Sequence, residues 1–462
     1  MRILLAASEF SPLVRTGGLG EAVAGIAGAL AAAGHDVSVA LPRYRHLTAL
    51  GVEGEPAGPA RATYRHEAGG IEVILVDDPS AFDRAGIYGD SHGEGYEDQW
   101  LRFGGFSAAV RAISHDYDLV HLHDAHAGPA ALDNPTPTVF TIHNSAYGIF
   151  GPLVETAAVV GVDVRHTAPG ADLEWWGQAN FLKAGIAASD RVTTVSPSFA
   201  RQLTEDASIS GGLDGVLRSL PHPVAGIVNG LNPDEWNPRT DTAVTAPFTP
   251  NRPYPRKATR QALLAEAGLA DGIVFGNVGR MAEQKGLHLL DPAIDLLVGE
   301  GLRLVLVGDG ELNPMVDGWV ERHPHAIWHA PYEERLSRVV SAGADFYLMP
   351  SRFEPCGIGQ IYAMRYGAPP VVRLTGGLND TVIDLDESPA DATGFGFRDF
   401  RHEELIKTVR RAMRIFRQSR GEYRRLQRNG MLTDFSWGAA AQHYLVAYEQ
   451  AMLYRRERSS GG

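Results

Sequence analysis

The feature that most constrains the fold is a regular alternation of short apolar runs with segments of helical periodicity. In the first half of the chain, the runs that have the apolar character and turn-residue boundaries of β-strands are residues 2–8, 35–42, 71–77, 117–124, 136–144 and 191–197. Helical patterns separate them, at Glu21–Ala33, Gln99–Ile113 and residues 175–189. Because strands that alternate with helices usually pair in parallel, with helices over both faces, the sequence predicts an α/β fold.

A proline-rich segment interrupts the alternation and predicts a domain boundary. Residues 245–255 read TAPFTPNRPYP, and prolines at this density exclude regular structure. The alternation then restarts, with strand-like runs at 272–280, 301–310, 326–332, 344–351 and 369–374 and helical patterns at 286–301 and 333–344. We therefore expect two doubly wound domains, residues 1–246 and 247–434, whose strand-end loops face a central cleft.

Composition and charge exclude several functional classes. Of the 462 residues 44% are hydrophobic and 21% are charged, as in an ordinary globular protein, and the net charge of −13 disfavours nucleic acid and anionic membranes as partners. Cys356 is the only cysteine, so the chain forms no internal disulfide. The apolar start of the chain is too short for a signal peptide, and no apolar run is long enough for a membrane span. These observations predict a cytoplasmic protein.

The letters TGGL occur twice, at Thr16–Leu19 and at Thr375–Leu378, each time between a strand-like run and a helical pattern. Glycines at a helix start allow backbone N–H groups to approach an anion. The first loop lacks the G-x-G-x-x-G spacing of dinucleotide-binding proteins, and taken alone it is equally consistent with a tight turn. Arg15 beside it favours a phosphate. The equivalent positions of the two loops suggest that both bind one diphosphate.

Charged side chains follow two strands of the second half. Arg280 and Lys285 come directly after the first of these strands, where two cations suit a diphosphate, although solvated surface cations are the commoner case. Glu354 follows the run FYLMP and precedes a glycine-flanked helix start. A carboxylate there either interacts with the helix dipole or accepts hydrogen bonds from a sugar, and the residues leave both roles open.

Histidines follow two strands of the first half. His121 and His123 share one strand face, and Asp124 and His126 come after them. An H-x-H pair can chelate zinc in a hydrolase, but the sequence offers no comparable further ligands, so a metal hydrolase is a minor alternative. His143 lies at the end of the next strand, where a histidine could bind a sugar, although a lone histidine is more often structural.

Together these motifs resemble the bacterial glycogen synthases and plant starch synthases, retaining glycosyltransferases with two Rossmann-like domains (the GT-B fold). The resemblance extends from residues 4–23 to residues 426–445 and includes GIVNGLNPDEWNP and PSRFEPCGIGQIYAMRYG. It implies transfer of glucose from ADP-glucose, the usual bacterial donor, or UDP-glucose to the non-reducing end of an α-1,4-glucan. It also implies that no metal or other cofactor takes part, and that a C-terminal helix, residues 435–462, returns to the first domain.

The resemblance assigns roles to individual positions. The catalytic positions are Arg280, Lys285, His143 and Glu354. The positions at the donor phosphates and base are Arg15, Gly17, Gly18, Tyr332, Thr375, Gly376 and Gly377, with Tyr332 stacked on the base. The positions on the sugar and acceptor side are Glu21, Asp124 and Asn144.

The chain departs from the family pattern at four single positions and in residues 143–149, HNSAYGI, which lack the expected AYQG pattern. Arg15 replaces a usual lysine, Glu21 an aspartate, Ala125 an aromatic residue and Gly359 a threonine. The positions predicted to bind the diphosphate are otherwise kept, whereas those facing the sugar and acceptor differ. Two alternatives follow from this: a glucosyltransferase that acts on a small acceptor, and a weakly active glucan-binding protein.

Overall fold

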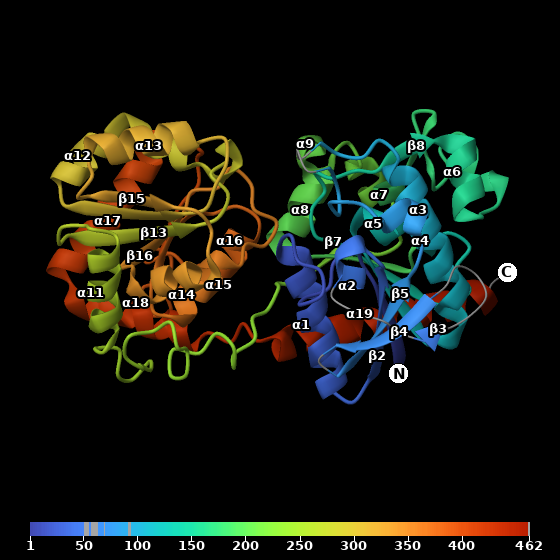
Figure 1. Cartoon of the computed structure of the whole chain (residues 1–462), viewed down its shortest axis with the longest axis horizontal. Coiled ribbons are helices and arrows are strands. Elements are labelled where there is room, and N and C mark those ends of the chain that lie inside the picture. The colour runs from blue at the N-terminus through green and yellow to red at the C-terminus, as the bar shows by residue number, and fades with distance from the viewer. Residues whose placement is uncertain (50–54, 57–62, 69, 91–93, 461–462) are drawn as a thin grey trace. The chain divides into compact units, whose positions relative to one another are not determined.

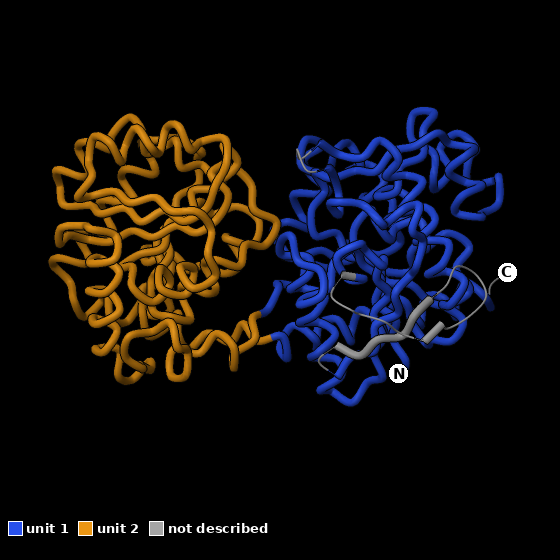
Figure 2. The backbone as a smooth tube through the Cα atoms, in the orientation of Figure 1, with its two compact units in different colours: residues 1–230, 437–462 blue, residues 231–436 orange. Residues whose placement is uncertain are grey.

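The computed structural model describes residues 1–49, 55–56, 63–68, 70–90 and 94–460 (Figure 1). The chain forms two compact units, which Figure 2 colours separately: unit 1 is Met1–Gly230 with Trp437–Gly462, and unit 2 is Leu231–Ser436. Each unit has a sheet that is mainly or wholly parallel. The predicted fold class, two Rossmann-like α/β domains, is therefore confirmed. Within the described residues, no helix combines the length and apolarity that a membrane span requires.

Unit 1 contains a nine-stranded sheet of order β12-β11-β7-β6-β1-β2-β5-β4-β3, in which only the pairs β3–β4 and β4–β5 are antiparallel. A separate antiparallel sheet has the order β8-β10-β9. The strands are β1 (Arg2–Ala6), β2 (Asp36–Pro42), β3 (Glu55–Pro56), β4 (Thr63–Ala68), β5 (Ile71–Val76), β6 (Leu119–His123), β7 (Thr138–Ile142), β8 (Phe150–Pro152), β9 (Glu174–Trp175), β10 (Gln178–Asn180), β11 (Arg191–Thr194) and β12 (Ala225–Gly226).

Helices cover the nine-stranded sheet and connect its parallel strands. The longest of those within the first 230 residues are α1 (Gly18–Ala32) and α4 (Gln99–Ile113), and the C-terminal helix α19 (Trp437–Ser460) packs against α1, β7 and β11. The others are α2 (Arg45–Ala49), α3 (Pro79–Phe82), α5 (Asp124–Ala127), α6 (Leu153–Val160), α7 (Phe181–Ala188), α8 (Pro197–Glu205), α9 (Ala207–Ser210) and α10 (Asp214–Arg218).

Unit 2 contains a six-stranded, wholly parallel sheet of order β15-β14-β13-β16-β17-β18. Its strands are buried on both faces: Phe275 of β13 packs with Trp319 in one core, and the adjacent Val274 packs with Val340 in the other. This explains their continuous apolar runs. The strands are β13 (Ile273–Val278), β14 (Leu302–Val307), β15 (Ile327–Ala330), β16 (Phe346–Met349), β17 (Pro370–Arg373) and β18 (Phe395–Phe397).

Helices lie on both sides of this sheet, with α12 and α13 on one side and α14 on the other (Figure 1). The first helix, α11, begins at Arg256, directly after the proline-rich segment. The helices are α11 (Arg256–Glu266), α12 (Ile294–Gly299), α13 (Asn313–Arg322), α14 (Glu334–Gly343), α15 (Gly359–Arg365), α16 (Gly377–Thr381), α17 (His402–Gln418) and α18 (Arg420–Leu432).

Every strand-like run identified in the sequence contains a strand, but two helical predictions were partly wrong. Residues 175–189 do not form one helix: β9 and β10 come first, joined by Trp176 and Gly177 in left-handed conformations, and α7 begins only at Phe181. Residues 286–301 are divided as well, because Pro292 lies in a 3₁₀ segment (Leu287–Ala293) that precedes α12.

The segment after Gly230 packs within unit 2. The Trp236 ring stacks on Tyr362 with 3.6 Å between ring centroids, and the Tyr366 hydroxyl donates a hydrogen bond to Asp241. The boundary expected between residues 246 and 247 from the proline-rich segment therefore lies inside unit 2. At the other end, Trp437 begins the helix that belongs to unit 1.

Candidate active site

In unit 2, three predicted catalytic side chains lie near the carboxyl ends of β13 and β16. The Lys285 ammonium lies 2.7 Å from the Glu354 carboxylate, and both side chains are largely buried. The Ser351 hydroxyl donates to the same Glu354 oxygen at 3.1 Å. A positive and a negative group are thus held together at the sheet edge where open α/β proteins bind ligands.

Gln284 connects the loop that carries the two cations to the loop that carries Glu354. Its side-chain oxygen accepts a hydrogen bond from Arg280 at 3.1 Å, and its side-chain nitrogen donates to the Phe353 carbonyl at 2.9 Å. Gly286 allows this close approach: it has φ +75°, and a Cβ there would lie 2.1 Å from the Pro350 carbonyl oxygen. The two loops therefore form one structural unit that presents Arg280 and Lys285.

The second TGGL loop packs directly on the Glu354 loop. The Gly377 N–H donates to the carbonyls of Glu354 and Pro355 at 3.0 and 3.1 Å, and the Thr375 N–H donates to the Arg373 carbonyl. These two amides therefore hold the loop together, although both were predicted to bind phosphate. Their predicted role stays a prediction, as it does for Gly376, which has φ +47°. Tyr332 follows β15 and is 53% exposed, so its ring is accessible.

The departure at Gly359 has a packing explanation. A Cβ at this first residue of α15 would lie 2.5 Å from the Tyr347 hydroxyl oxygen. That hydroxyl donates to the Val278 carbonyl at 3.2 Å, across the β13–β16 pair. Tyr347 thus occupies the space that a larger residue at position 359 would need. Ala125, the other small residue among these departures, is fully buried, so this difference from the family also lies in the protein interior.

In unit 1, the first TGGL loop is fixed by Glu9, a residue that the sequence-based predictions missed. The buried Glu9 carboxylate accepts hydrogen bonds from the Thr16 N–H and hydroxyl, both at 2.7 Å, and from the Gly17 N–H at 3.2 Å. The Tyr88 hydroxyl also donates to it at 2.7 Å. A carboxylate placed directly after the buried strand β1 was the available signal in the sequence.

Two departures from the family pattern contact one another in unit 1. Arg15, in the first TGGL loop, forms an ion pair with Glu21 of α1 at 2.5 Å. Both side chains are partly exposed. The two substitutions therefore fit one another, since the glutamate at position 21 reaches the guanidinium at position 15. The ion pair joins a residue predicted at the donor phosphates to one predicted on the sugar and acceptor side.

The predicted catalytic residue His143 and the predicted sugar-side residues Asp124 and Asn144 lie together at the ends of β6 and β7. The Asp124 carboxylate accepts hydrogen bonds from the backbone N–H groups of His143 and Asn144, at 2.7 and 3.4 Å. The His143 ring contacts the His123 ring, with 2.9 Å between the nitrogens. Asp124 has φ +55°, which re-aims the chain after β6.

Burial controls the charge of this cluster. It raises the pKa of Asp124 to about 7, and the nearby Glu9 carboxylate acts in the same direction. Burial also lowers the pKa of His143 to about 3, so this imidazole is neutral near pH 7. The site therefore presents a neutral imidazole beside a carboxyl group that ionises close to neutrality.

The raised pKa of Asp124 predicts how the melting temperature of the Asp124→Asn variant depends on pH. The folded protein retains the Asp124 proton up to about pH 7, whereas the unfolded chain releases it near pH 4, so the stabilisation from this proton is complete below pH 4 and is lost as the pH rises to 7. The neutral Asn variant should therefore gain melting temperature relative to the unchanged protein as the pH is raised from 5 to 8. A difference in melting temperature that is constant over this range would contradict the prediction.

The histidines do not form a metal site within the described residues. His121 hydrogen-bonds to the Tyr448 hydroxyl at 2.8 Å and to the Thr141 hydroxyl at 2.6 Å, so both ring nitrogens have protein partners. In the part of the chain that the structure describes, no group of three or more histidine, cysteine, aspartate or glutamate side chains is placed to hold a metal ion. His121 instead joins β6 to α19 through Tyr448.

Comparison with known proteins agrees with this geometry. Residues 2–219 match the family model of the starch synthase catalytic domain, and residues 261–430 match that of group 1 glycosyl transferases. The chain is 37% identical to a glycogen synthase of Paracidovorax citrulli, over 98% of this chain and 95% of that protein. It is also 37% identical to a glycogen synthase of Moorella thermoacetica, over 99% and 98%.

A solved structure gives the same result. The catalytic domain of starch synthase IV from Arabidopsis thaliana, bound to ADP and acarbose, superposes with a TM-score of 0.85 and 29% identity, over 98% of this chain and 99% of that one. Sequence and fold thus agree over nearly the whole length. The chain belongs to the family of bacterial glycogen synthases and plant starch synthases, and it is a glycosyltransferase.

Proposed function

We propose that the protein transfers glucose from ADP-glucose to the non-reducing end of an α-1,4-glucan, with retention of the anomeric configuration. The observation that carries the proposal is the cluster of Arg280, Lys285 and Glu354 at the strand ends of unit 2. The glycogen synthases that match over the whole chain support the glucan acceptor, and the ADP bound to the Arabidopsis enzyme supports the adenine nucleotide.

The cluster suits departure of a diphosphate. An ammonium group has three N–H donors, so Lys285 can keep its bond to Glu354 and still donate to a phosphate oxygen. Arg280 adds a second cation on the same loop. Positive groups fixed before the reaction stabilise the charge that develops on the leaving diphosphate without reorganisation. We therefore propose that the two side chains supply this stabilisation and that no metal ion is required.

Retention follows from a displacement on one face of the sugar. Glu354 is committed to Lys285 and Ser351, which suits a hydrogen-bond acceptor for sugar hydroxyls better than a nucleophile. In the proposed step, the bond from the anomeric carbon to the diphosphate oxygen breaks, and the acceptor oxygen forms its bond on the same face. The departing diphosphate takes the acceptor proton, so charge and atoms balance.

A single assay tests the proposal. The protein is incubated with ADP-glucose or UDP-glucose, with and without glycogen, and in the presence of EDTA. We expect ADP release that depends on glycogen and is unchanged by EDTA. Release only with small sugars would favour the alternative of a small-acceptor glucosyltransferase, no release would favour a glucan-binding protein, and loss of activity in EDTA would contradict the metal-free step.

A further inference from the structure

Unit 2 contains a cavity of about 620 Å³ that none of the predicted site residues lines. Residues of α11, α17 and α18, which are labelled in Figure 1, line this cavity, together with residues at the amino ends of β13 and β16. Arg280 and Glu354 follow the carboxyl ends of these same two strands. The cavity is therefore at the opposite edge of the sheet from the proposed diphosphate cluster.

The wall of the cavity is strongly basic. Six lining residues are arginine or lysine and two are aspartate. Both aspartates, Asp271 and Asp345, already form ion pairs with Arg260. The chain as a whole carries a net charge of −13, so this concentration of positive charge differs from the rest of the molecule.

Three of these cations are exposed: Lys257, Arg420 and Arg424. Among the described residues, no ion pair joins any of the three to an acidic side chain. The guanidinium of Arg420 instead lies 4.0 Å from the centre of the Phe416 ring, and that of Arg424 lies 5.2 Å from the centre of the Tyr254 ring. Grouped like charges repel one another, and an anion in the cavity would relieve that repulsion.

The chemistry of the wall selects phosphate among anions. Guanidinium groups donate paired hydrogen bonds that match phosphate oxygens. Tyr254 is 64% exposed and offers a ring face beside Arg424. The volume is that of a small-molecule site. We propose that this basic cavity binds a small phosphate-bearing metabolite that also contains a ring, a sugar phosphate or a nucleotide.

Calorimetric titration of the full chain with inorganic phosphate, a hexose phosphate and ADP, at physiological salt, tests the proposal. We expect at least one probe to bind and the variant Arg420→Ala/Arg424→Ala to weaken that binding tenfold or more. The matched control is Arg425→Ala/Arg428→Ala, which removes the same charge from the same helix outside the cavity and should have little effect. Binding of the hexose phosphate alone identifies a sugar phosphate site, and binding of ADP that persists in Lys285→Ala identifies a nucleotide site.

No binding of any probe at millimolar concentration would overturn the proposal, and so would equal weakening by both double variants. Binding of ADP alone that is lost in Lys285→Ala and kept in Arg420→Ala/Arg424→Ala would also overturn it, because the nucleotide would then occupy the proposed donor cluster. Only this use of Lys285 rests on the proposed function. Failure of glucan synthesis, with phosphate binding lost only in the cavity variant, would reject the proposed function and leave the cavity assignment standing.

Discussion

Replacement of Lys285 by alanine is expected to lower the turnover of glucose transfer about 10²–10³-fold, the effect of removing one fixed electrostatic donor from an active site. The ammonium is one of the two cations proposed to stabilise the leaving diphosphate. Its loss also leaves the Glu354 carboxylate, only 9% exposed as a side chain, with a hydroxyl from Ser351 in place of a positive charge. Both effects concern side chains that are proposed to lie at the reacting bond.

The measurement is the rate of ADP release at saturating ADP-glucose and glycogen. Lys407→Ala, which removes an exposed lysine of α17, is the matched control and should retain normal turnover. Lys285→Arg keeps the charge but changes its geometry, so an intermediate rate is expected. A near-normal rate for Lys285→Ala, in a protein that melts at the normal temperature, would remove Lys285 from the proposed mechanism.

The sheets could be predicted from the sequence because local composition determines them. Strands such as β13 and β14 are buried on both faces and are therefore apolar at nearly every position, which is visible without knowledge of their partners. The short strands β9 and β10 could not be predicted in this way. They pair with one another, and β10 also pairs with β8. The turn between them has Trp176 and Gly177 in left-handed conformations, which no periodic pattern indicates.

The same distinction applies to the candidate site. Lys285 and Glu354 could be identified because each follows an apolar strand, and the ends of parallel strands meet at one sheet edge. Glu9 and Tyr347 were missed. The carboxylate of Glu9 shortly after β1 was a visible signal, but the sequence does not show that it accepts hydrogen bonds from Thr16, Gly17 and Tyr88. The importance of Tyr347 depends on its contact with Gly359, which results from tertiary packing and not from residue spacing.

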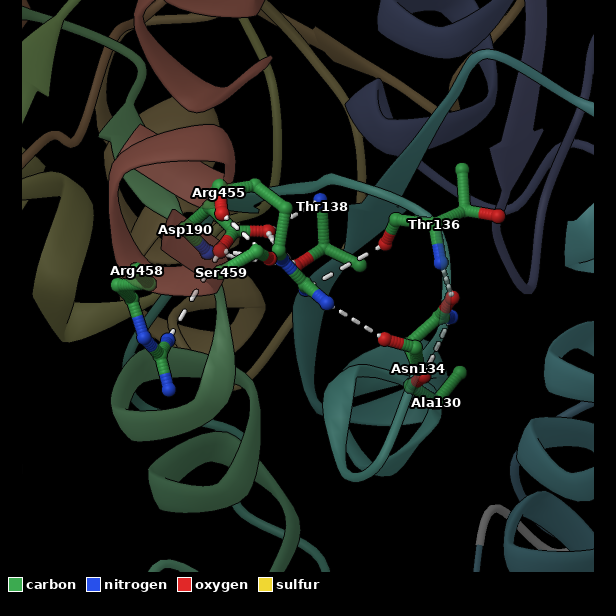
Figure 3. Close-up of polar contacts among 8 residues, drawn as sticks. All are labelled: Ala130, Asn134, Thr136, Thr138, Asp190, Arg455, Arg458 and Ser459. Carbon is green, nitrogen blue, oxygen red and sulfur yellow. Dashed lines mark hydrogen bonds and ion pairs between the residues drawn. The ribbon is translucent and has the colours of Figure 1, made fainter. Parts of the chain in front are cut away.

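The second large effect concerns stability: Asp190→Ala is expected to destabilise unit 1 by about 3–5 kcal/mol, the cost of breaking a buried ion pair. Asp190 is fully buried, and Arg455 of α19 donates to its carboxylate at 2.7–3.1 Å (Figure 3). The Thr138 N–H at the start of β7 donates to the same carboxylate at 2.8 Å. Without Asp190, a largely buried guanidinium and a buried amide both lose their acceptor.

Arg458 provides the matched control on the same helix. Its guanidinium lies 3.9 Å from Asp190 and is 58% exposed, so Arg458→Ala should be nearly neutral. Arg455→Ala should destabilise strongly, because among the described residues it leaves the buried Asp190 carboxylate with only Thr138 and the exposed Arg458 beside it. Arg455 also donates to the Asn134 carbonyl at 2.8 Å, which ties α19 to the segment before β7 (Figure 3). Denaturant unfolding of each variant measures these differences, and equal effects of the two arginine substitutions would contradict the assignment.

The double variant Asp190→Ala/Arg455→Ala separates charge from packing. If the cost of each single substitution is mainly an uncompensated buried charge, removal of both partners should destabilise unit 1 by clearly less than the sum of the two single effects. Additive costs would show instead that the two residues stabilise the protein independently, through Thr138 on one side and Asn134 on the other. A double-variant cost that is smaller than the sum of the two single costs therefore identifies the Asp190–Arg455 pair itself as the link that holds the C-terminal helix on unit 1.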